Sequence, residues 1–336
     1  MDTDTPAPKP VDLAALGELL IDFTRAGASP TGQALFERNP GGAPANVAVA
    51  AARLGLTAQF VGKVGADAHG DFLRATLEGE GVGTNGLLQD PDACTTLAFV
   101  DVDPDSGERS FAFARKPGAD MMLRPDEVSL EALDTCRVLH VGSISLTDDP
   151  ARSATIFAVR EASDAGALIS YDPNYRPALW PDEQTAVEEM CDLLGSADLL
   201  KMSHEEAALL FGTEDTEEAA RMALARGVRL VAITRGEGGA YLATHAAQIS
   251  VASCPACCVD TTGAGDAFWG AVLAWLLRDR GVRTADDLDA LGADDLTACA
   301  DFACAAAACC VQGHGGMPSM ATRAQVEEQL AKAARD

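Results

Sequence analysis

The chain alternates between short apolar runs suited to strands and longer stretches with helical periodicity, and this alternation constrains the fold most strongly. Because predicted helices lie between predicted strands, the pattern favours β-α-β units and an α/β fold with a mostly parallel sheet covered on both faces. Ligands in such folds bind beyond the carboxyl ends of the strands. The predicted strands are Val11–Phe23, Gln59–Gly62, Val138–Gly142, Leu168–Asp172, Leu199–Lys201 and Leu230–Thr234, and the predicted helices include Pro44–Leu54, Asp67–Glu80, Ala151–Ala165, Pro181–Leu194 and Glu205–Phe211.

Two segments interrupt this alternation. Thr24–Asn39 is a polar excursion after the first strand, and Cys94–Lys116 has the pattern of a β-hairpin, with strands Thr95–Val102 and Arg109–Ala114 around turn residues. Strands inserted in this way cannot easily join a parallel core. We therefore predict a small sheet that covers the pocket, a lid formed by segments 22–40 and 94–117 within one domain over 11–330. A surface hairpin without a role is the alternative.

The charge balance excludes some partners. The sequence has 25 Lys and Arg against 51 Asp and Glu, a net charge of −26. Such a field repels nucleic acids and anionic membranes, so we expect neither as a partner. It also repels nucleotides, so a nucleotide site would need positive potential from backbone amides, a few cations or a metal ion.

The N-terminal residues Met1–Pro10 are polar and proline-rich, without the apolar core of a signal peptide. We expect a disordered leader at residues 1–10. No apolar stretch is long enough to span a bilayer. These features favour a cytoplasmic protein.

Ten cysteines fit a reducing compartment. Cys254 and Cys257 form one C-x-x-C pair, followed by Cys258, but no second pair stands at the spacing of a zinc site. We expect the cysteines to be buried as small apolar residues, with metal binding by thiols as the weaker alternative. The five histidines show no metal-like spacing.

The run Asp260-Thr261-Thr262-Gly263-Ala264-Gly265-Asp266 is the most specific feature of the sequence. A strand-like Cys257–Val259 precedes it, and a helix is predicted from Ala264 to about Leu277. Glycines at a helix start let backbone amides and the positive end of the helix dipole approach an anion. A carboxylate in the same turn suits phosphoryl transfer, because it can take the proton of an attacking hydroxyl.

A second glycine cluster opens the first predicted helix. Gly41 and Gly42 permit close approach of a ligand, and Asn46 offers both a donor and an acceptor to a polyol. Asp22, placed at the end of the first predicted strand, can accept hydrogen bonds from paired hydroxyls. An ordinary turn or cap residue is the alternative for Asp22.

Together, Gly-Gly-x-x-x-Asn-x-Ala near the N-terminus and Asp-Thr-x-Gly-Ala-Gly-Asp near the C-terminus resemble the paired motifs of the PfkB-type, ribokinase-like carbohydrate kinases. The resemblance extends from about Val11 to Met320. It implies a three-layer α/β/α fold with a small β-sheet lid, and ATP-dependent phosphorylation of a small sugar.

The resemblance also implies roles for individual residues. Asp266 is similar to the general base of the family, and Gly263, Ala264 and Gly265 to its anion hole. The sugar-binding positions correspond to Asp22, Gly41, Gly42 and Asn46. The ATP-binding positions correspond to Lys201, Thr234, Gly236, Gly239, Gly263, Gly265, Cys304 and Ala308.

Metal ions are implied as well. Glu206 resembles a residue that helps place Mg²⁺ through water, although Ser203 stands where the family often has an asparagine. Asp260 and Thr262 resemble positions that hold a monovalent cation, usually K⁺. Cys304 also departs from the family pattern, since an asparagine is common there. The absence of this asparagine removes a polar contact near the adenine, which would loosen the selectivity for the nucleotide.

The sugar is indicated by the run Asp172-x-Asn174-x-Arg176, which places three polar groups at the ligand edge of the sheet. This run and Phe113–Asp120 resemble the fructokinase branch, which implies fructose as acceptor. Arg115 is predicted to reach the sugar from the lid, and Lys63 to add positive charge. A solvated cation is the alternative for both.

The sequence leaves other functions open. The acceptor could instead be 2-keto-3-deoxygluconate, ribose or a nucleoside, or the chain could be a non-catalytic sugar- or nucleotide-binding regulator. A dinucleotide oxidoreductase lacks support, since no G-x-G-x-x-G follows the first strand, and no G-x-x-x-x-G-K-[ST] of a P-loop enzyme is present. Lid strands of this family often pair between subunits, so we expect a homodimer through residues such as Phe99, Phe111 and Phe113.

Overall fold

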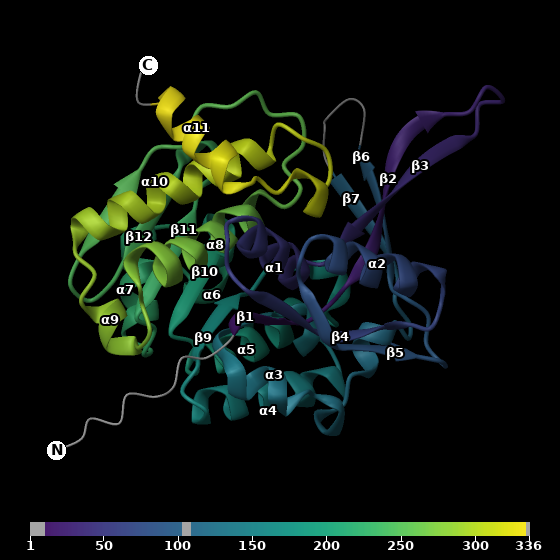
Figure 1. The fold of residues 1–336 in the computed structure, drawn as a ribbon, viewed down its shortest axis with the longest axis horizontal. Coiled ribbons are helices and arrows are strands. Elements are labelled where there is room, and N and C mark those ends of the chain that lie inside the picture. The colour runs from purple at the N-terminus through teal and green to yellow at the C-terminus, as the bar shows by residue number, and fades with distance from the viewer. Residues whose placement is uncertain (1–10, 103–108, 334–336) are drawn as a thin grey trace.

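The computed structural model describes residues 11–102 and 109–333 and places them in two β-sheets with flanking helices (Figure 1). The larger sheet has nine strands in the order β13-β12-β11-β10-β9-β8-β1-β4-β5. All neighbours are parallel except the β11–β12 and β12–β13 pairs. Its strands are β1 Val11–Leu16, β4 Ala58–Gly65, β5 Gly83–Asp90, β8 Cys136–Gly142, β9 Leu168–Asp172, β10 Leu199–Ser203, β11 Leu230–Thr234, β12 Ala240–Ala243 and β13 Gln248–Val251.

The predicted leader at residues 1–10 and the predicted hairpin turn lie outside the described ranges. No helix within these ranges is long and apolar enough to cross a membrane.

Helices cover both faces of the nine-stranded sheet, as predicted (Figure 1). One apolar core lies between the sheet and α1, α2, α8, α10 and α11, and a second lies between the opposite face and α3 to α7. The central strands are buried on both sides, which explains their continuous apolar sequences. The helices are α1 Ala43–Arg53, α2 Ala68–Gly79, α3 Leu130–Thr135, α4 Ala151–Asp164, α5 Glu183–Leu194, α6 His204–Phe211, α7 Thr216–Leu224, α8 Ala264–Ala274, α9 Ala285–Asp289, α10 Ala293–Cys310 and α11 Arg323–Ala333.

The smaller sheet has four strands in the order β3-β2-β6-β7: β2 Leu20–Ala28, β3 Ala34–Gly41, β6 Leu97–Val102 and β7 Arg109–Ala114. The β2–β3 hairpin projects beyond the body of the molecule (Figure 1). Both segments that interrupt the alternation thus belong to one sheet, because β2 pairs in parallel with β6. This confirms the prediction of a second, small sheet.

The single strand predicted at Val11–Phe23 is wrong. The chain leaves the large sheet after Leu16 and enters the small sheet at Leu20. Gly17, with φ 155°, lies in the bend, where a Cβ atom would come within 2.6 Å of Pro44. Asp22 therefore lies within the small sheet rather than at the end of a core strand.

Two further differences concern local structure. Cys257–Val259 is not a strand but part of an irregular segment between β13 and α8, held by hydrogen bonds from the amides of Val259 and Asp260 to the carbonyl of Val311. The helix predicted up to about Leu277 is α-helical only to Ala274 and continues as a π-helical turn to Arg280. The strands β5, β12 and β13 were not predicted from the sequence. Glycine or polar residues break the apolar pattern of β5 and β13, and β12 has only four residues.

The cysteines are only partly buried, so that expectation is wrong for three of them. Cys136, Cys299, Cys304 and Cys310 are buried, whereas Cys94, Cys257 and Cys258 are exposed. The exposed thiols lie in connecting segments, where the chain has no second layer to cover them. Within the described ranges, no three His, Cys, Asp or Glu side chains are grouped to hold a metal ion.

A buried polar chain joins the centre of the sheet to α8. The indole Nε1 of Trp269 donates to Ser170 Oγ at 2.8 Å, and Ser170 Oγ lies 2.9 Å from His140 Nδ1. Burial, followed by the charge of Lys201, lowers the pKa of His140 to about 3, so this ring is neutral. His140 thus has a packing role between β8, β9 and α8, the helix that carries Asp266.

Candidate active site

The glycine run before α8 forms a tight turn at the helix N-terminus. Gly263 has φ 79°, and a Cβ atom there would lie 2.9 Å from Gly316 Cα. A larger residue would be strained and would push this loop away. Asp260 holds the same loop, since its Oδ2 accepts from the amide of Gly315 at 2.9 Å. The amides at the start of α8 are thereby fixed at the positive end of the helix.

Asp266 is buried in the first turn of α8 and meets α1 there. Its Oδ2 accepts a hydrogen bond of 2.7 Å from Asn46 Nδ2. Burial raises the pKa of Asp266 to about 6, although the charge of Lys201 and the Asn46 bond oppose this shift. Asn46 Oδ1 is buried without a partner among the described residues. A ligand hydroxyl is the kind of group that would satisfy it.

Lys201 lies in the middle of β10, with its ammonium beside the start of α8. Its Nζ donates to Asp172 Oδ2 at 2.8 Å, and both side chains are buried. Burial disfavours the charged amine, but Asp172, Glu206 and Asp266 outweigh it and raise the pKa of Lys201. A Cβ atom on Gly265 would lie 2.9 Å from Nζ, so this glycine lets the ammonium approach the helix start.

The predicted sugar-binding residues from the N-terminal half lie together. A Cβ atom on Gly41 would come within 2.1 Å of Asp22 Oδ2, and one on Gly42, which has φ 114°, within 2.3 Å of the carbonyl of Glu18. Burial raises the pKa of Asp22 to about 7, with Arg176 lowering it and Asp266 raising it. Asp22 and Asp266 therefore share one electrostatic environment.

Asn174 and Arg176 follow β9 at the same sheet edge. Asn174 has φ 44°, and its amide donates to Asp172 Oδ1 at 3.1 Å. Arg176 Nη1 donates to the carbonyl of Tyr175 at 3.0 Å, and its charge acts on both Asp22 and Asp266. The polar run after β9 thus lies beside the two aspartates.

Arg115 is placed differently from the prediction. Its guanidinium is buried at the base of the lid, where Nε donates to Asp120 at 2.8 Å, Nη1 to Thr147 at 2.9 Å and Nη2 to the carbonyl of Ile144 at 3.1 Å. These bonds hold the segment after β7 against the segment after β8 of the nine-stranded sheet. Lys63 is likewise paired, with Glu127 at 2.6 Å. The alternative prediction, that Arg115 and Lys63 are solvated cations, is therefore wrong for both residues.

A cavity of about 640 Å³ opens next to the start of α8. Its walls come from the loop after β11, the irregular segment before α8, α8 itself and α10. Six of the predicted ATP-binding residues line it, while Lys201 and Gly263 do not. Its lining is Thr234, Gly236, Glu237, Gly239, Ser253, Cys254, Pro255, Ala256, Cys258, Thr261, Ala264, Gly265, Phe268, Cys304, Ala307, Ala308 and Val311.

The predicted metal-binding carboxylates accept hydrogen bonds from nearby backbone amides. Glu206 Oε1 accepts from the amide of Tyr175 at 2.6 Å, and Oε2 accepts from that of Ser203 at 2.7 Å. Asp260 Oδ1 accepts from both the amide and the hydroxyl of Thr262. Each carboxylate oxygen retains acceptor capacity, so both sites fit contact with a cation, for Glu206 through water.

Sequence reasoning missed Glu18, although it stands in the bend between the two sheets. Glu18 Oε1 accepts from the amide of Ala43 at 2.9 Å, at the start of α1, and Oε2 is buried without a partner among the described residues. Burial raises the pKa of Glu18 to about 7. A carboxylate next to Gly17 gave no signal in the sequence, because only the fold places it against the second glycine cluster.

The family comparison explains this arrangement. The model of the pfkB family of carbohydrate kinases matches residues 11–323. The chain belongs to this family. It is a carbohydrate kinase with the ribokinase-like fold.

Its relatives include fructokinases. Fructokinase-1 of Zea mays is 40% identical over 324 residues, which cover 96% of this chain and 98% of that protein. A fructokinase from Xylella fastidiosa, solved with bound ATP, has a TM-score of 0.88 and 32% identity and covers 96% of this chain and 99% of its own. A Vibrio cholerae fructokinase double mutant, solved with fructose, ADP and potassium, has a TM-score of 0.84 and 31% identity, covering 97% of this chain and 100% of its own.

The raised pKa of Glu18 predicts a pH dependence of stability. The folded state keeps the proton up to about pH 7, while the unfolded state loses it near pH 4.5, so the free energy of unfolding falls as pH rises between these values. Glu18→Gln keeps the acceptor for Ala43 but removes the titration. Relative to the variant, the wild type should lose up to about 3 kcal/mol across this range.

Urea unfolding at pH values from 4.5 to 8 measures this difference. The matched control is Glu131→Gln, at an exposed position, which should leave the pH profile unchanged. Parallel pH profiles for the wild type and Glu18→Gln would contradict the prediction.

Proposed function

We propose that this carbohydrate kinase transfers the γ-phosphoryl group of ATP to a primary hydroxyl of D-fructose, which gives fructose 6-phosphate. One observation carries the proposal: the buried Asp266 carboxylate lies between the two predicted ligand regions. It is bonded to Asn46 on the sugar side and directly follows Gly265, which lines the cavity. A proton acceptor there can serve a hydroxyl that attacks a nucleotide in the cavity.

The residues divide the reaction between them. Asp22 and Asn46 orient the sugar hydroxyls, and Asp266 takes the proton of the attacking one. With a pKa of about 6, Asp266 is ionised at neutral pH and ready to accept it. The amides of Gly263–Gly265 and the positive end of α8 stabilise the charge that spreads over the transferred phosphoryl group. Arg176 adds a positive charge beside the same carboxylates.

Cations complete the proposed site. Mg²⁺ bound with ATP would neutralise charge on the phosphates, and Glu206 would hold it through water. Asp260 and Thr262 would hold K⁺ beside the glycine turn. The relatives solved with ATP, or with fructose, ADP and potassium, support these ligands for the fold.

The proposed kinase domain covers residues 11–330, with the lid segments 22–40 and 94–117 inserted in it. Closure of the lid over the sugar would exclude water, which competes as phosphoryl acceptor. Arg115 would contribute by anchoring the base of the lid through its ion pair with Asp120. We propose a cytoplasmic location for this domain.

A panel of acceptors tests the substrate. Fructose, ribose, 2-keto-3-deoxygluconate and a nucleoside are each supplied with ATP and Mg²⁺, and ADP release is measured in a coupled assay. We expect the highest kcat/KM with fructose, because the run from Asp172 to Arg176 is shared with the fructokinase pattern. Inactivity with fructose and turnover of another acceptor would reassign the substrate, and binding without turnover of any acceptor would indicate a regulator.

Asp266→Asn tests the base. Loss of a general base lowers rates by roughly 10²–10⁴-fold, so kcat should fall by about this range while ATP binding persists. In the wild type, kcat should also fall as pH drops through about 6, because the raised pKa makes Asp266 protonated below it. Calorimetric titration with ATP is the control for binding. A variant with near-normal kcat would refute the assignment.

We also propose a homodimer through the lid. Phe23, Phe36 and Phe99 lie on one face of the small sheet, where the rings of Phe23 and Phe99 stack with centroids 5.3 Å apart. Phe36 and Phe99 are about 40% exposed, at 43% and 39%. The register places Phe113 on the opposite face, with Asp22, and the side chain of Phe111 lies outside the described residues.

A second copy covering this aromatic face would bury the exposed rings. We expect light scattering to give a dimer for the wild type and a monomer for Phe99→Glu. Ile156→Glu, at a 52% exposed position on α4, is the matched control and should stay dimeric. A monomeric wild type at working concentrations would count against the lid interface.

A further inference from the structure

The nucleotide cavity has three thiols in its wall. Cys254 and Cys258 lie in the irregular segment between β13 and α8, and Cys304 faces them from α10. Ala264, Gly265 and Phe268 of α8 line the same cavity. The thiols and the start of α8 therefore border one cavity, in which the proposed function places ATP.

The three thiols differ in accessibility. Cys304 is buried, and burial raises its pKa to about 12, so it is an inert thiol at neutral pH. Cys254 is half-buried, and its sulfur accepts from Gln329 Nε2 of α11 at 3.5 Å. Cys258 is exposed and still lines the cavity. It is therefore the thiol that solvent-borne reagents reach most easily.

We propose that Cys258 is a modification site at which a low-molecular-weight disulfide attaches and blocks the nucleotide cavity. The inference rests on the proposed function, in which this cavity binds ATP. A group linked to Cys258 would project from the cavity wall and compete with a bound nucleotide for the same space.

The chemistry is thiol–disulfide exchange. Cys258 first loses its proton to water, and the thiolate attacks one sulfur of the disulfide R–S–S–R. The S–S bond of the reagent breaks, a bond forms between Cys258 Sγ and S–R, and R–S⁻ leaves and takes up a proton. The oxidising equivalents come from the reagent disulfide, and an added thiol reverses the reaction by the same steps.

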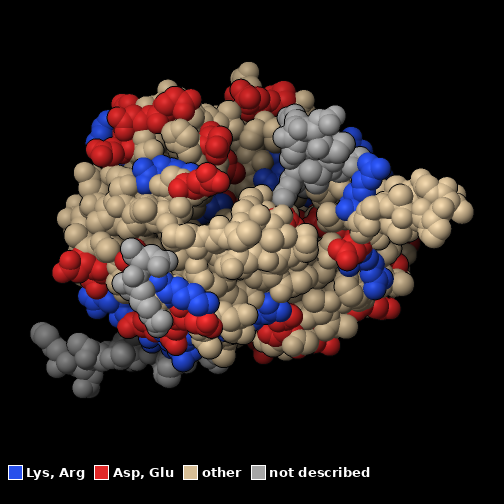
Figure 2. All heavy atoms as spheres, turned by 90° about the horizontal axis from the view of Figure 1, so that it is seen from above, with Lys and Arg blue, Asp and Glu red and all other residues tan. Residues whose placement is uncertain are grey.

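Charge selects the class of disulfide. Glu237 lines the same cavity, and the whole chain carries −26. Acidic side chains are spread over the face of the molecule seen from above (Figure 2). Cationic or neutral disulfides should therefore react faster than polyanionic ones. Cystamine, a small dication, is the matching probe.

Cys257 provides an internal control. It is exposed and adjacent to Cys258 but does not line the cavity. The two thiols lie in one segment and are both exposed to solvent. A difference between their labelling rates when the cavity is occupied is therefore due to the cavity and not to a general difference in reactivity.

The experiment treats the full-length protein with cystamine, with and without a non-hydrolysable ATP analogue, and follows each cysteine by peptide mass spectrometry. If only the free protein reacts, the analogue at 100 times its Kd should slow the labelling of Cys258 by about 100-fold and leave Cys257 unchanged. Labelled wild type should lose binding of the analogue and regain it with dithiothreitol. Cys258→Ser should retain binding after the same treatment, and Cys257→Ser should lose it like the wild type.

Two results would overturn the inference alone: binding of the analogue without protection of Cys258, or equal loss of binding in Cys258→Ser. Failure of the untreated protein to bind the analogue would overturn the proposed function and this inference with it. Circular dichroism of each labelled sample establishes that loss of binding is not unfolding, and a labelled protein that has unfolded would also contradict the proposal.

Discussion

The site depends on one buried ammonium group held among buried carboxylates. Lys201 pairs with Asp172 at 2.8 Å and lies within the field of Glu206 and Asp266. Ionised carboxylates are costly to bury without a compensating charge. By supplying it, Lys201 lets residues from β9, β10, α6 and α8 meet at one edge of the sheet. The positions of Asp266, the proposed base, and of the polar run after β9 follow from this pairing.

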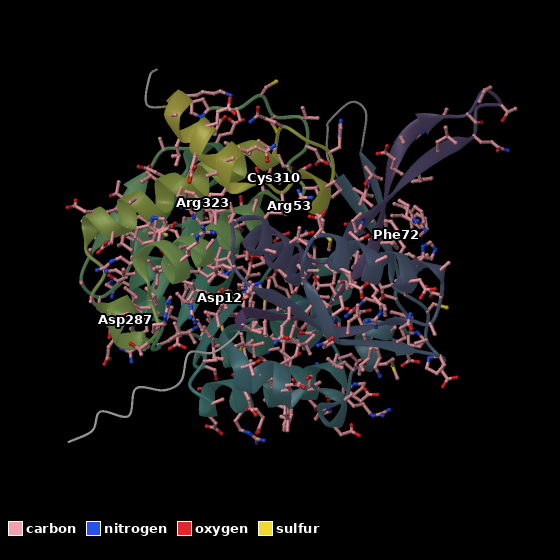
Figure 3. All side chains as sticks on the ribbon, in the orientation of Figure 1. Asp12, Arg53, Phe72, Asp287, Cys310 and Arg323 are labelled. Atoms are coloured by element: carbon pink, nitrogen blue, oxygen red, sulfur yellow. The ribbon has the colours of Figure 1, made fainter. Side chains whose placement is uncertain are left out.

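Near Lys201, hydrogen bonds between segments that are distant in the sequence connect the loops of the site. Asp260 holds the loop after α10 against the glycine turn, and Arg53, at the end of α1, donates to the carbonyls of Pro318 and Met320 from the same loop (Figure 3). Cys310, at the end of α10, donates to the carbonyl of Thr262. Such cross-links fix the amides of the proposed anion hole before any ligand arrives.

The lid is joined to the body through a second buried charged group. Arg115 and Asp120 form an ion pair at its base, and Glu18 lies within their electrostatic reach while it accepts from the start of α1. The bend between the two sheets and the second glycine cluster are thereby coupled. On the other side of the lid, Arg38 of β3 lies over the ring of Phe72 in α2 at 3.9 Å (Figure 3). We therefore expect a change at the base of the lid to affect the second glycine cluster, which is proposed to bind the sugar.

The sequence by itself determined the α/β class, the helix after the glycine run and the residues of the two motifs, because periodicity and glycine positions are local properties. Six of the residues that it predicted to bind ATP line one cavity. Only the tertiary structure decided that Asp22 belongs to the small sheet, that Arg115 is buried in an ion pair with Asp120 and that Glu18 accepts from the first amide of α1. These depend on where the chain turns at Gly17 and on which charges become buried together, and burial is a property of the packed fold rather than of any short segment.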